Sequence, residues 1–249
     1  MKLSKNTVLV TGGSSGIGLE LSKQLLLRAN KVIICGRSKS KLLEAQKLFP
    51  KLEIFQCDLS DKNQCNDLVN WLNEKHPELN VLINNAAIVH KTSFIDTKDI
   101  IEMAELETAT NFLAPIRLIK LLHPLLKINN NPNIINITTG LIYAPRVDYP
   151  FYNATKAALH SFTQTLRIQL AKTNIKVIEV MFPAVKTPWH KGNPPKIAIT
   201  SQKAVSEMIK RLEGGDTEIK IAGVKILYAL SRIAPKFALK KINSLKSEK

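Results

Sequence analysis

Tyr152 and Lys156 form the most chemically informative pair in the sequence, which reads Tyr-Asn-Ala-Thr-Lys from residue 152 to residue 156. On a helix, residues four apart lie on one face. An unperturbed phenol titrates near roughly 10, so proton transfer near neutral pH requires a neighbouring cation that stabilises the phenolate. Lys156 could supply that charge. Because a Tyr-x-x-x-Lys spacing also occurs by chance on solvated helices, acid–base chemistry here depends on the surrounding motifs.

A glycine-rich turn lies near the N-terminus, where a short apolar run ends in TGGSSGIG at residues 11–18. Gly12 lets the backbone turn tightly, Gly16 lets a pyrophosphate approach, and Gly18 lets the following helix pack closely on the strand. The start of that helix offers unpaired N–H groups to phosphates. The spacing is GxxxGxG rather than the commoner GxGxxG, and a purely structural turn is the alternative. We expect the turn to bind a dinucleotide through Gly12, Ser14, Ser15, Gly16, Ile17 and Gly18.

Arg37 and Ser38 follow the next apolar run, about 20 residues beyond the glycine turn. An NAD-binding chain normally has an acidic residue at this place, which binds the hydroxyls of the adenosine ribose. This sequence has no carboxylate there, and a guanidinium suits a 2′-phosphate through bidentate hydrogen bonds. We therefore predict NADP(H) in preference to NAD(H). The alternative is that Arg37 is an ordinary solvated side chain.

Small and polar residues end two further apolar runs, at the place where an open α/β sheet binds its ligand. The first run ends at Asp58, and the second ends in NNAA at residues 84–87. Asp58 could contact the adenine side of the cofactor or, equally, cap the following helix. We expect cofactor contacts from Asp58, Leu59, Asn85, Ala86 and Ala87.

Short apolar runs alternate with helical patterns along most of the chain. The runs predict strands at residues 7–11, 31–35, 53–57, 81–84, 133–138, 176–181 and 218–221. Apolar residues at helical spacing predict helices at 16–28, 40–48, 62–74, 99–126, 152–172 and 201–212. Strands that are apolar throughout indicate a parallel sheet covered on both faces. The fold class is predicted to be α/β, a single doubly wound parallel sheet of about seven strands flanked by helices.

Regularity decreases in residues 182–200, which contain four prolines and are expected to be irregular. We predict one domain of residues 1–222, followed by a basic amphipathic extension of residues 223–249. Residues 111–249 hold 22 basic and 7 acidic side chains, against 14 and 13 in residues 1–110. This asymmetry suggests an anionic partner. The extension could lie on an anionic membrane surface, pack across a partner subunit or cover the active site.

The composition is that of a globular protein of 249 residues, with 45% apolar and 22% charged residues. No run approaches the roughly 18 uninterrupted apolar residues of a membrane span, and the N-terminal segment lacks the features of a secretory signal. Three cysteines are expected to be free thiols in a reducing compartment, so we expect a cytoplasmic protein, with peripheral contact at the inner membrane surface as an open alternative. Neither a metal nor a nucleic-acid partner is expected, because metal-ligand spacing and recognition modules are both missing from the sequence.

Taken together and in order, TGGSSGIG, NNAA, Asn111, Thr139, Tyr152 and Lys156 make residues 5–222 resemble the short-chain dehydrogenase/reductase family. The runs ITTGLIYAPRVDYPFYNATKAALHSFT and LSRIAPKFALKK also resemble the branch named for D-alanine esterification of teichoic acids. The resemblance implies a Rossmann-type fold. It also implies reversible hydride transfer between a nicotinamide cofactor and a small carbonyl compound or secondary alcohol, usually in a homodimer or homotetramer.

The resemblance assigns roles to individual positions. Tyr152 would be the general acid that protonates the carbonyl oxygen, and Lys156 would lower its pKa and hold the nicotinamide ribose. Thr139 stands where the family has a serine that hydrogen-bonds the substrate carbonyl, and Asn111 would hold a water of a proton relay. Further cofactor contacts would come from Asn85, Ala86, Val185 and Thr187.

The sequence departs from the family pattern at several of these positions. Thr139 adds a methyl group that stiffens the side chain, Ala87 replaces a glycine, and FPAV at residues 182–185 replaces the family's PGxV. The departures motivate a second hypothesis, a catalytically weak cofactor-binding or scaffold protein on the same fold.

The substrate is expected to be apolar, because four large apolar residues are pocket candidates: Leu141, Ile142, Tyr143 and Phe151. The family carries a substrate-covering loop at residues 182–200. Trp189 and His190 in that loop could line the pocket or form an exposed tip.

Overall fold

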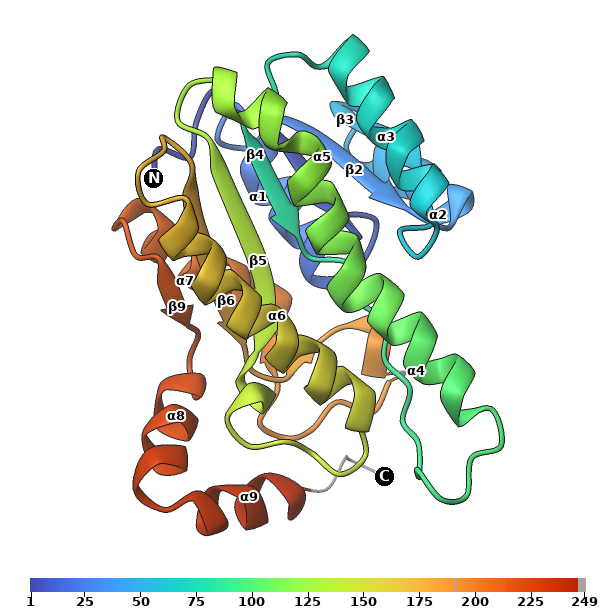
Figure 1. Ribbon diagram of the computed structural model, residues 1–249, viewed down its shortest axis with the longest axis vertical. Helices are drawn as coiled ribbons and strands as arrows, with labels where there is room; N and C mark the ends of the chain where they lie inside the picture. Colours follow the sequence, from blue (N-terminus) through green and yellow to red (C-terminus); the bar gives the residue numbers. More distant parts are fainter. Residues whose placement is uncertain (191, 246–249) are drawn as a thin grey trace.

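A seven-stranded parallel sheet forms the centre of the molecule (Figure 1). Its strands are β1 (Thr7–Thr11), β2 (Lys31–Gly36), β3 (Leu52–Gln56), β4 (Val81–Asn84), β5 (Asn133–Thr139), β6 (Lys176–Phe182) and β9 (Glu218–Lys220). They lie in the order β3-β2-β1-β4-β5-β6-β9, so the winding direction changes between β1 and β4. The prediction of a single doubly wound α/β sheet is confirmed. The computed structural model describes residues 1–190 and 192–245.

Helices cover both faces of this sheet. The helices of the described residues are α1 (Gly16–Leu26), α2 (Lys39–Leu48), α3 (Lys62–Lys75), α4 (Ile100–Thr108), α5 (Ala114–Ile128), α6 (Pro150–Gln169), α7 (Ser201–Glu213), α8 (Val224–Ile233) and α9 (Pro235–Asn243), of which the last two lie at the end of the sheet and not on its faces. On β1, Val8 and Val10 face one apolar cluster with α1 and α7, whereas Leu9 faces a second cluster with α3 and α5. Both faces of the strand are therefore apolar, as a sheet covered on two sides requires.

The helix predicted at residues 99–126 contains a widened turn at its centre. α4 continues through a π-helical turn, η1 (Ala109–Leu113), into α5. Asn111 lies in this turn and is fully buried. Its amide accepts a hydrogen bond from the N–H of Ile88 and donates one to the carbonyl oxygen of the same residue, each at 2.8 Å. The widened turn therefore holds the loop that follows β4, in keeping with the frequent occurrence of π-turns at functional sites.

The proline-containing segment 182–200 has more regular structure than its composition predicts. β7 (Val185–Lys186) pairs in parallel with β8 (Ile199–Thr200), and a short 3₁₀ turn, η3 (Pro188–His190), lies between them. The expectation of an irregular segment is wrong at these two strands. The prolines lie outside them and therefore remove no donor from the pairing.

The C-terminal helix pair, α8 and α9, lies beyond β9 at the carboxyl ends of the strands (Figure 1). Three hydrogen bonds hold its end. Asn243 accepts from the N–H of Val147 at 2.7 Å and donates to the carbonyl oxygen of Pro145 at 3.0 Å, and Arg146 donates to the carbonyl oxygen of Leu245 at 2.9 Å. Among the described residues, none of the helices combines the length and apolar character that crossing a membrane requires.

Candidate active site

The glycine turn between β1 and α1 borders a cavity of about 740 Å³ at the carboxyl ends of the strands. Gly12 and Gly16 have positive φ angles of 65° and 54°. A Cβ atom on Gly12 would lie 2.9 Å from the Cα atom of Ala86, so a larger residue would displace backbone. The hydroxyl of Ser15, at the N-cap of α1, makes no capping hydrogen bond. The turn therefore presents open backbone, a free hydroxyl and a helix N-terminus to the cavity.

Thr11 connects the glycine turn to the NNAA run, and sequence reasoning missed it. Its hydroxyl donates to the carbonyl oxygen of Ile83 at 3.3 Å and accepts from the N–H groups of Asn85 and Ala86 at 2.9 and 3.0 Å. Asn85 returns a hydrogen bond of 2.9 Å from its side-chain amide to the carbonyl oxygen of Thr11. These bonds hold two cavity-lining loops against each other.

Arg37 and Lys41 lie at the same cavity and are both exposed. Ser38 caps α2 by accepting a hydrogen bond of 3.4 Å from the N–H of Lys41. Among the described residues, no carboxylate lies within ion-pair distance of the Arg37 guanidinium. Two cations without a partner acid therefore border this end of the cavity.

Asp58 lines the cavity, and the alternative that it caps the following helix is wrong. Its carboxylate accepts hydrogen bonds from the N–H and the hydroxyl of Ser60, at 2.9 and 2.7 Å. Asp61 is the N-cap of α3 instead and accepts from the N–H of Asn63 at 2.7 Å. Both aspartates have capping chemistry, and only the true start of the helix distinguishes them.

Every residue predicted to contact the cofactor lines this one cavity. They are Gly12, Ser14, Ser15, Gly16, Ile17, Gly18, Arg37, Ser38, Asp58, Leu59, Asn85, Ala86, Ala87, Tyr152, Lys156, Val185 and Thr187. The fold thus brings the predicted residues together, and the contacts themselves stay predictions. Asn111 is placed differently: it lies behind the cavity wall, where it holds Ile88 and donates to the hydroxyl of Thr155 at 3.3 Å.

Tyr152, Lys156 and Thr139 converge at the cavity. The Nζ atom of Lys156 lies 6.0 Å from the centre of the Tyr152 ring, and the lysine is only 2% exposed. Burial raises the pKa of Tyr152 to about 12, and the nearby Glu107 charge acts in the same direction. A hydrogen bond with Thr139 opposes both effects by lowering this pKa. Burial lowers the pKa of Lys156 to about 8, against the Glu179 carboxylate, which raises it. At neutral pH the site therefore holds a protonated phenol beside an ammonium group.

Comparison with known proteins decides the family. The family described as short chain dehydrogenase matches residues 6–198. The chain is a short-chain dehydrogenase/reductase. It is 42% identical over 224 residues to an uncharacterized oxidoreductase, DltE, of Bacillus subtilis, covering 88% of this chain and 89% of the relative. This short-chain dehydrogenase/reductase is therefore an oxidoreductase, and its resemblance to the branch named for D-alanine esterification is confirmed.

More distant relatives agree with the family. A fatty acyl-CoA reductase of Mycobacterium tuberculosis is 26% identical, covering 94% of this chain and 83% of the relative. A crystal structure of a short chain dehydrogenase from Burkholderia cenocepacia in complex with NADP superposes with a TM-score of 0.85 at 24% identity, covering 97% of this chain and 99% of that one. The second comparison shows that the short-chain dehydrogenase/reductase fold is shared along nearly the whole chain.

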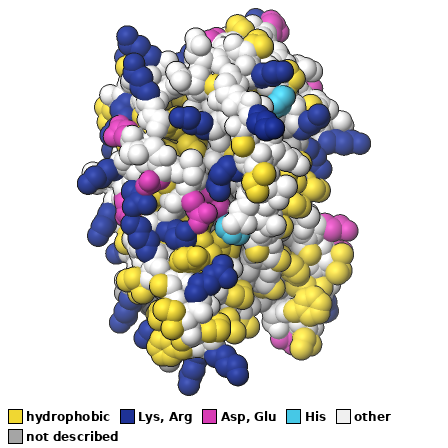
Figure 2. Space-filling view, turned by 60° about the vertical axis from the view of Figure 1, so that its left-hand side comes forward, with side chains coloured by type: hydrophobic (Ala, Val, Ile, Leu, Met, Phe, Trp, Pro, Cys, Tyr) yellow, Lys and Arg dark blue, Asp and Glu magenta, His cyan; other side chains and the backbone are white. Residues whose placement is uncertain are grey.

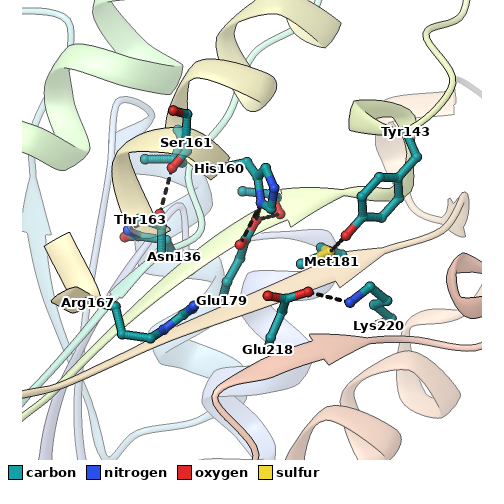
Figure 3. Close-up of polar contacts among 12 residues, drawn as sticks. Asn136, Tyr143, His160, Ser161, Thr163, Arg167, Glu179, Met181, Glu218 and Lys220 are labelled. Atoms are coloured by element: carbon teal, nitrogen blue, oxygen red, sulfur yellow. Dashed lines mark hydrogen bonds and ion pairs between the residues drawn. The ribbon is translucent and has the colours of Figure 1, made fainter. Parts of the chain in front are cut away.

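A buried carboxylate, that of Glu179, lies at the centre of a further group of polar contacts in this short-chain dehydrogenase/reductase (Figure 3). Glu179 on β6 is completely buried and accepts hydrogen bonds from the hydroxyl of Thr138 at 2.6 Å and from His160 Nδ1 at 2.8 Å. His160 projects from α6, one turn beyond Lys156, and the ion pair between Glu218 and Lys220 lies alongside (Figure 3). Sequence reasoning missed Glu179, although a single carboxylate inside an apolar strand was its visible signal.

The substrate side of the cavity only partly matches the predicted pocket. Leu141 lines it, but within the described residues Ile142, Tyr143 and Phe151 lie outside the lining. Tyr143 instead donates to the sulfur of Met181 at 3.1 Å (Figure 3). The prediction of a pocket wall at these three positions is wrong: Ile142 and Tyr143 belong to the short 3₁₀ turn after β5 and its end, from which Leu141 lines the cavity, and Phe151 lies on α6 outside the lining.

Trp189 and His190 line the cavity of this short-chain dehydrogenase/reductase. The Trp189 ring lies 6.2 Å from that of Tyr152 in a stacked arrangement, although Trp189 is 43% exposed. The two alternatives for these residues were the wall of the pocket and an exposed loop tip. Both residues belong to the wall, although Trp189 is also partly exposed to solvent.

The C-terminal helix pair supplies a wall that sequence reasoning left open. Six of its apolar or adjoining residues line the cavity: Val224, Ile226, Leu227, Leu230, Ile242 and Leu245. The extension therefore covers this cavity, which agrees with one of the three alternatives for it, packing over the predicted active site. The amphipathic pattern was the signal, but it does not identify the apolar surface that receives the helix.

Proposed function

We propose that this protein is an NADPH-dependent oxidoreductase that acts reversibly on an apolar carbonyl compound or secondary alcohol, with Tyr152 as the general acid and base. The convergence of Tyr152, Lys156 and Thr139 on one cavity carries the proposal. Bound NADPH would supply the hydride that reduces the carbonyl carbon. The protein's own residues would supply the proton and the orientation of the substrate.

The proton moves between Tyr152 and the substrate oxygen. In reduction, the phenol donates its proton to the carbonyl oxygen as that oxygen gains negative charge. The ammonium group of Lys156 stabilises the resulting phenolate, and its burial strengthens this interaction. The hydroxyl of Thr139 donates a hydrogen bond to the same oxygen and so orients the carbonyl. In oxidation, the Tyr152 phenolate takes the hydroxyl proton.

The residues that would hold NADPH fit its phosphates. Gly12 and Gly16 leave the backbone open beside the N-terminus of α1, which suits a pyrophosphate. Arg37 and Lys41 offer two cations to a 2′-phosphate, and residues 37–41, which directly follow β2, contain no acidic residue to bind ribose hydroxyls. The NADP complex of the Burkholderia cenocepacia protein supports the same choice.

The lining of the substrate side supports an apolar substrate. Leu141, Trp189 and Ile197 contribute from the core domain, and the C-terminal helix pair adds further aliphatic side chains. Two relatives that share this fold are described as fatty acyl-CoA reductases, of Mycobacterium tuberculosis and Acinetobacter baylyi. We therefore expect longer aliphatic aldehydes or ketones to be reduced more efficiently than short ones.

Replacing Tyr152 tests the proposal. Tyr152→Phe should lower kcat for aldehyde reduction by about 10²- to 10⁴-fold, because the proton donor is lost. The dissociation constant for NADPH, measured by fluorescence titration, should stay within about twofold, since the ring is retained. Undiminished turnover by Tyr152→Phe contradicts the assignment.

The second candidate, a catalytically weak cofactor-binding protein, rests on the extra methyl group of Thr139. Thr139→Ser restores the family's residue and should change kcat by less than about threefold if the threonine hydroxyl is functional. If wild type is inactive against a panel of aldehydes and ketones and only Thr139→Ser turns over, the non-catalytic candidate is favoured.

We also propose that the enzyme assembles as a homodimer or homotetramer in the cytoplasm. Three side chains around the start of α4 expose large apolar surface: Phe94 at 65%, Ile95 at 91% and Ile101 at 59%. All three cysteines are free and buried, which fits a reducing compartment. Light scattering on purified protein measures the mass, and a monomer at micromolar concentration contradicts the proposed assembly.

A further inference from the structure

The C-terminal helix pair has an inner and an outer face. The inner face packs beside the catalytic residues, because a Cβ atom on Gly140 would lie 3.0 Å from Cγ2 of Val224. Gly140 directly follows Thr139 in the chain. The buried residues Val224 and Ala238 anchor the two helices to the domain. The pair is therefore a fixed wall of the cavity, and its other side faces outward.

The outer face exposes large apolar side chains. Ile233 is 83% exposed, Phe237 is 56% exposed and Leu239 is 44% exposed. They come from the end of α8 and from α9, on either side of the break at Pro235. Three large apolar side chains exposed on two adjoining helices indicate an interaction surface rather than ordinary protein surface.

Cations surround these apolar side chains, and acidic residues are missing from the segment. Residues 224–245 contain no aspartate or glutamate and five exposed basic residues: Lys225, Arg232, Lys236, Lys240 and Lys241. Within the described part of the chain, none of the five forms an ion pair. In the lower part of Figure 2, apolar side chains lie among lysine and arginine side chains. Exposed apolar side chains among unpaired cations complement an anionic lipid surface.

The cavity opens beside this outer face. Ile226 is 65% exposed and Lys241 is exposed, yet both belong to the cavity lining. The rim of the substrate cavity and the basic apolar surface are therefore formed by the same two helices. Whatever lies against the outer face also lies against the mouth of the cavity.

We propose that the C-terminal helix pair docks this enzyme on an anionic phospholipid bilayer, with the mouth of the cavity facing the lipid. The inference deepens the proposed function, on which it rests in taking the cavity as the substrate site. A second copy of the chain fits this face less well, because two surfaces of the same positive charge repel each other. An anionic bilayer offers negatively charged headgroups to the basic residues of this face and an apolar interior to its exposed apolar side chains.

Vesicle sedimentation tests the docking with the full-length protein. Wild type should bind vesicles of phosphatidylglycerol and phosphatidylcholine, and should bind pure phosphatidylcholine at least about tenfold more weakly. Lys236→Glu/Lys240→Glu should weaken binding to the anionic vesicles at least about tenfold, as should Ile233→Ser/Phe237→Ser. The matched control Lys172→Glu/Lys176→Glu changes two exposed lysines at the amino end of β6 and should bind like wild type.

Several outcomes overturn the docking. They are failure of wild type to bind anionic vesicles, equal binding by Lys236→Glu/Lys240→Glu, and equal weakening by the Lys172/Lys176 control. If wild type does not bind vesicles and Ile233→Ser/Phe237→Ser converts an oligomer to a monomer, the face instead binds a second copy of the chain. Turnover of a water-soluble aldehyde in the absence of vesicles tests the proposed function separately. The outer-face variants should retain this turnover. Normal turnover by wild type that does not bind anionic vesicles therefore overturns only this inference.

Discussion

The Nζ atom of Lys156 donates a hydrogen bond of 2.8 Å to the carbonyl oxygen of Ile137 on β5. The cation is thus oriented by a neutral backbone group instead of by a carboxylate in direct contact. Its burial is consequently uncompensated at close range, and this is why the pKa of Lys156 falls to about 8. The strand that carries Thr139 also positions the cation that lies beside Tyr152, so Thr139 and Lys156 are both held by β5.

The pKa of Lys156 predicts the pH dependence of carbonyl reduction. Below about 8 the ammonium group is present and assists Tyr152, whose own pKa of about 12 keeps the phenol protonated throughout. Above about 8 the lysine loses its charge, the phenolate loses its stabilising partner, and kcat/KM should fall up to about tenfold per pH unit. Initial rates between pH 6 and pH 10 measure this. A flat profile up to pH 10 contradicts it.

Glu179→Gln should shift the fall in kcat/KM at alkaline pH, the alkaline limb of the pH profile, to lower pH. The Glu179 carboxylate raises the pKa of Lys156 through its charge, so the neutral amide removes this effect while keeping the shape of the side chain. Glu218→Gln, on the neighbouring strand and in an ion pair with Lys220, is the matched control and should leave the limb in place. If both variants shift the limb equally, the effect comes from the general field of the region instead of from Glu179.

Arg37→Ala should weaken NADPH binding about 10- to 100-fold and NADH binding less than about threefold, because only NADPH carries the 2′-phosphate. Lys39→Ala is the matched control: Lys39 is an exposed neighbour that does not line the cavity. Calorimetric titration of wild type and of both variants with each cofactor measures the six dissociation constants. Equal losses for the two cofactors would show that Arg37 supports the fold of the loop without reading the phosphate.

Gly12→Ala should destabilise the protein by about 1–3 kcal/mol, through its positive φ and the 2.9 Å approach to the backbone of Ala86. Gly36→Ala is the control, because a Cβ atom there would meet no atom closer than 3.5 Å. Urea denaturation gives the free energy of unfolding of each variant. A Gly12→Ala protein as stable as Gly36→Ala would show that the turn relaxes freely.

The central sheet was predictable because its strands are apolar on both faces. β1 and β4 begin and end at the predicted residues, 7–11 and 81–84. By contrast, β7 and β8 have two residues each, which is too short for any periodic pattern. Spacing also located the glycine turn and the Tyr152–Lys156 pair, because both depend on local geometry.

Other parts of the site depend on contacts between distant segments, which one sequence does not reveal. The pairing of His160 with Glu179 joins a helix to a strand 19 residues later. The amphipathic pattern of α8 and α9 predicts that one face is covered, but it names no covering surface. The packing of Val224 beside Gly140 supplies that information only in three dimensions.

The closing wall of the cavity has a practical consequence for handling the enzyme. Leu245 lines the cavity, and a fusion tag appended after residue 249 would begin only five residues further along the chain. At the other end, the Met1 ammonium group donates to the carbonyl oxygen of Leu212, and the N-terminus lies far from α9 (Figure 1). An amino-terminal affinity handle leaves the reaction chamber undisturbed, whereas a carboxyl-terminal handle reports on an enzyme with an altered wall.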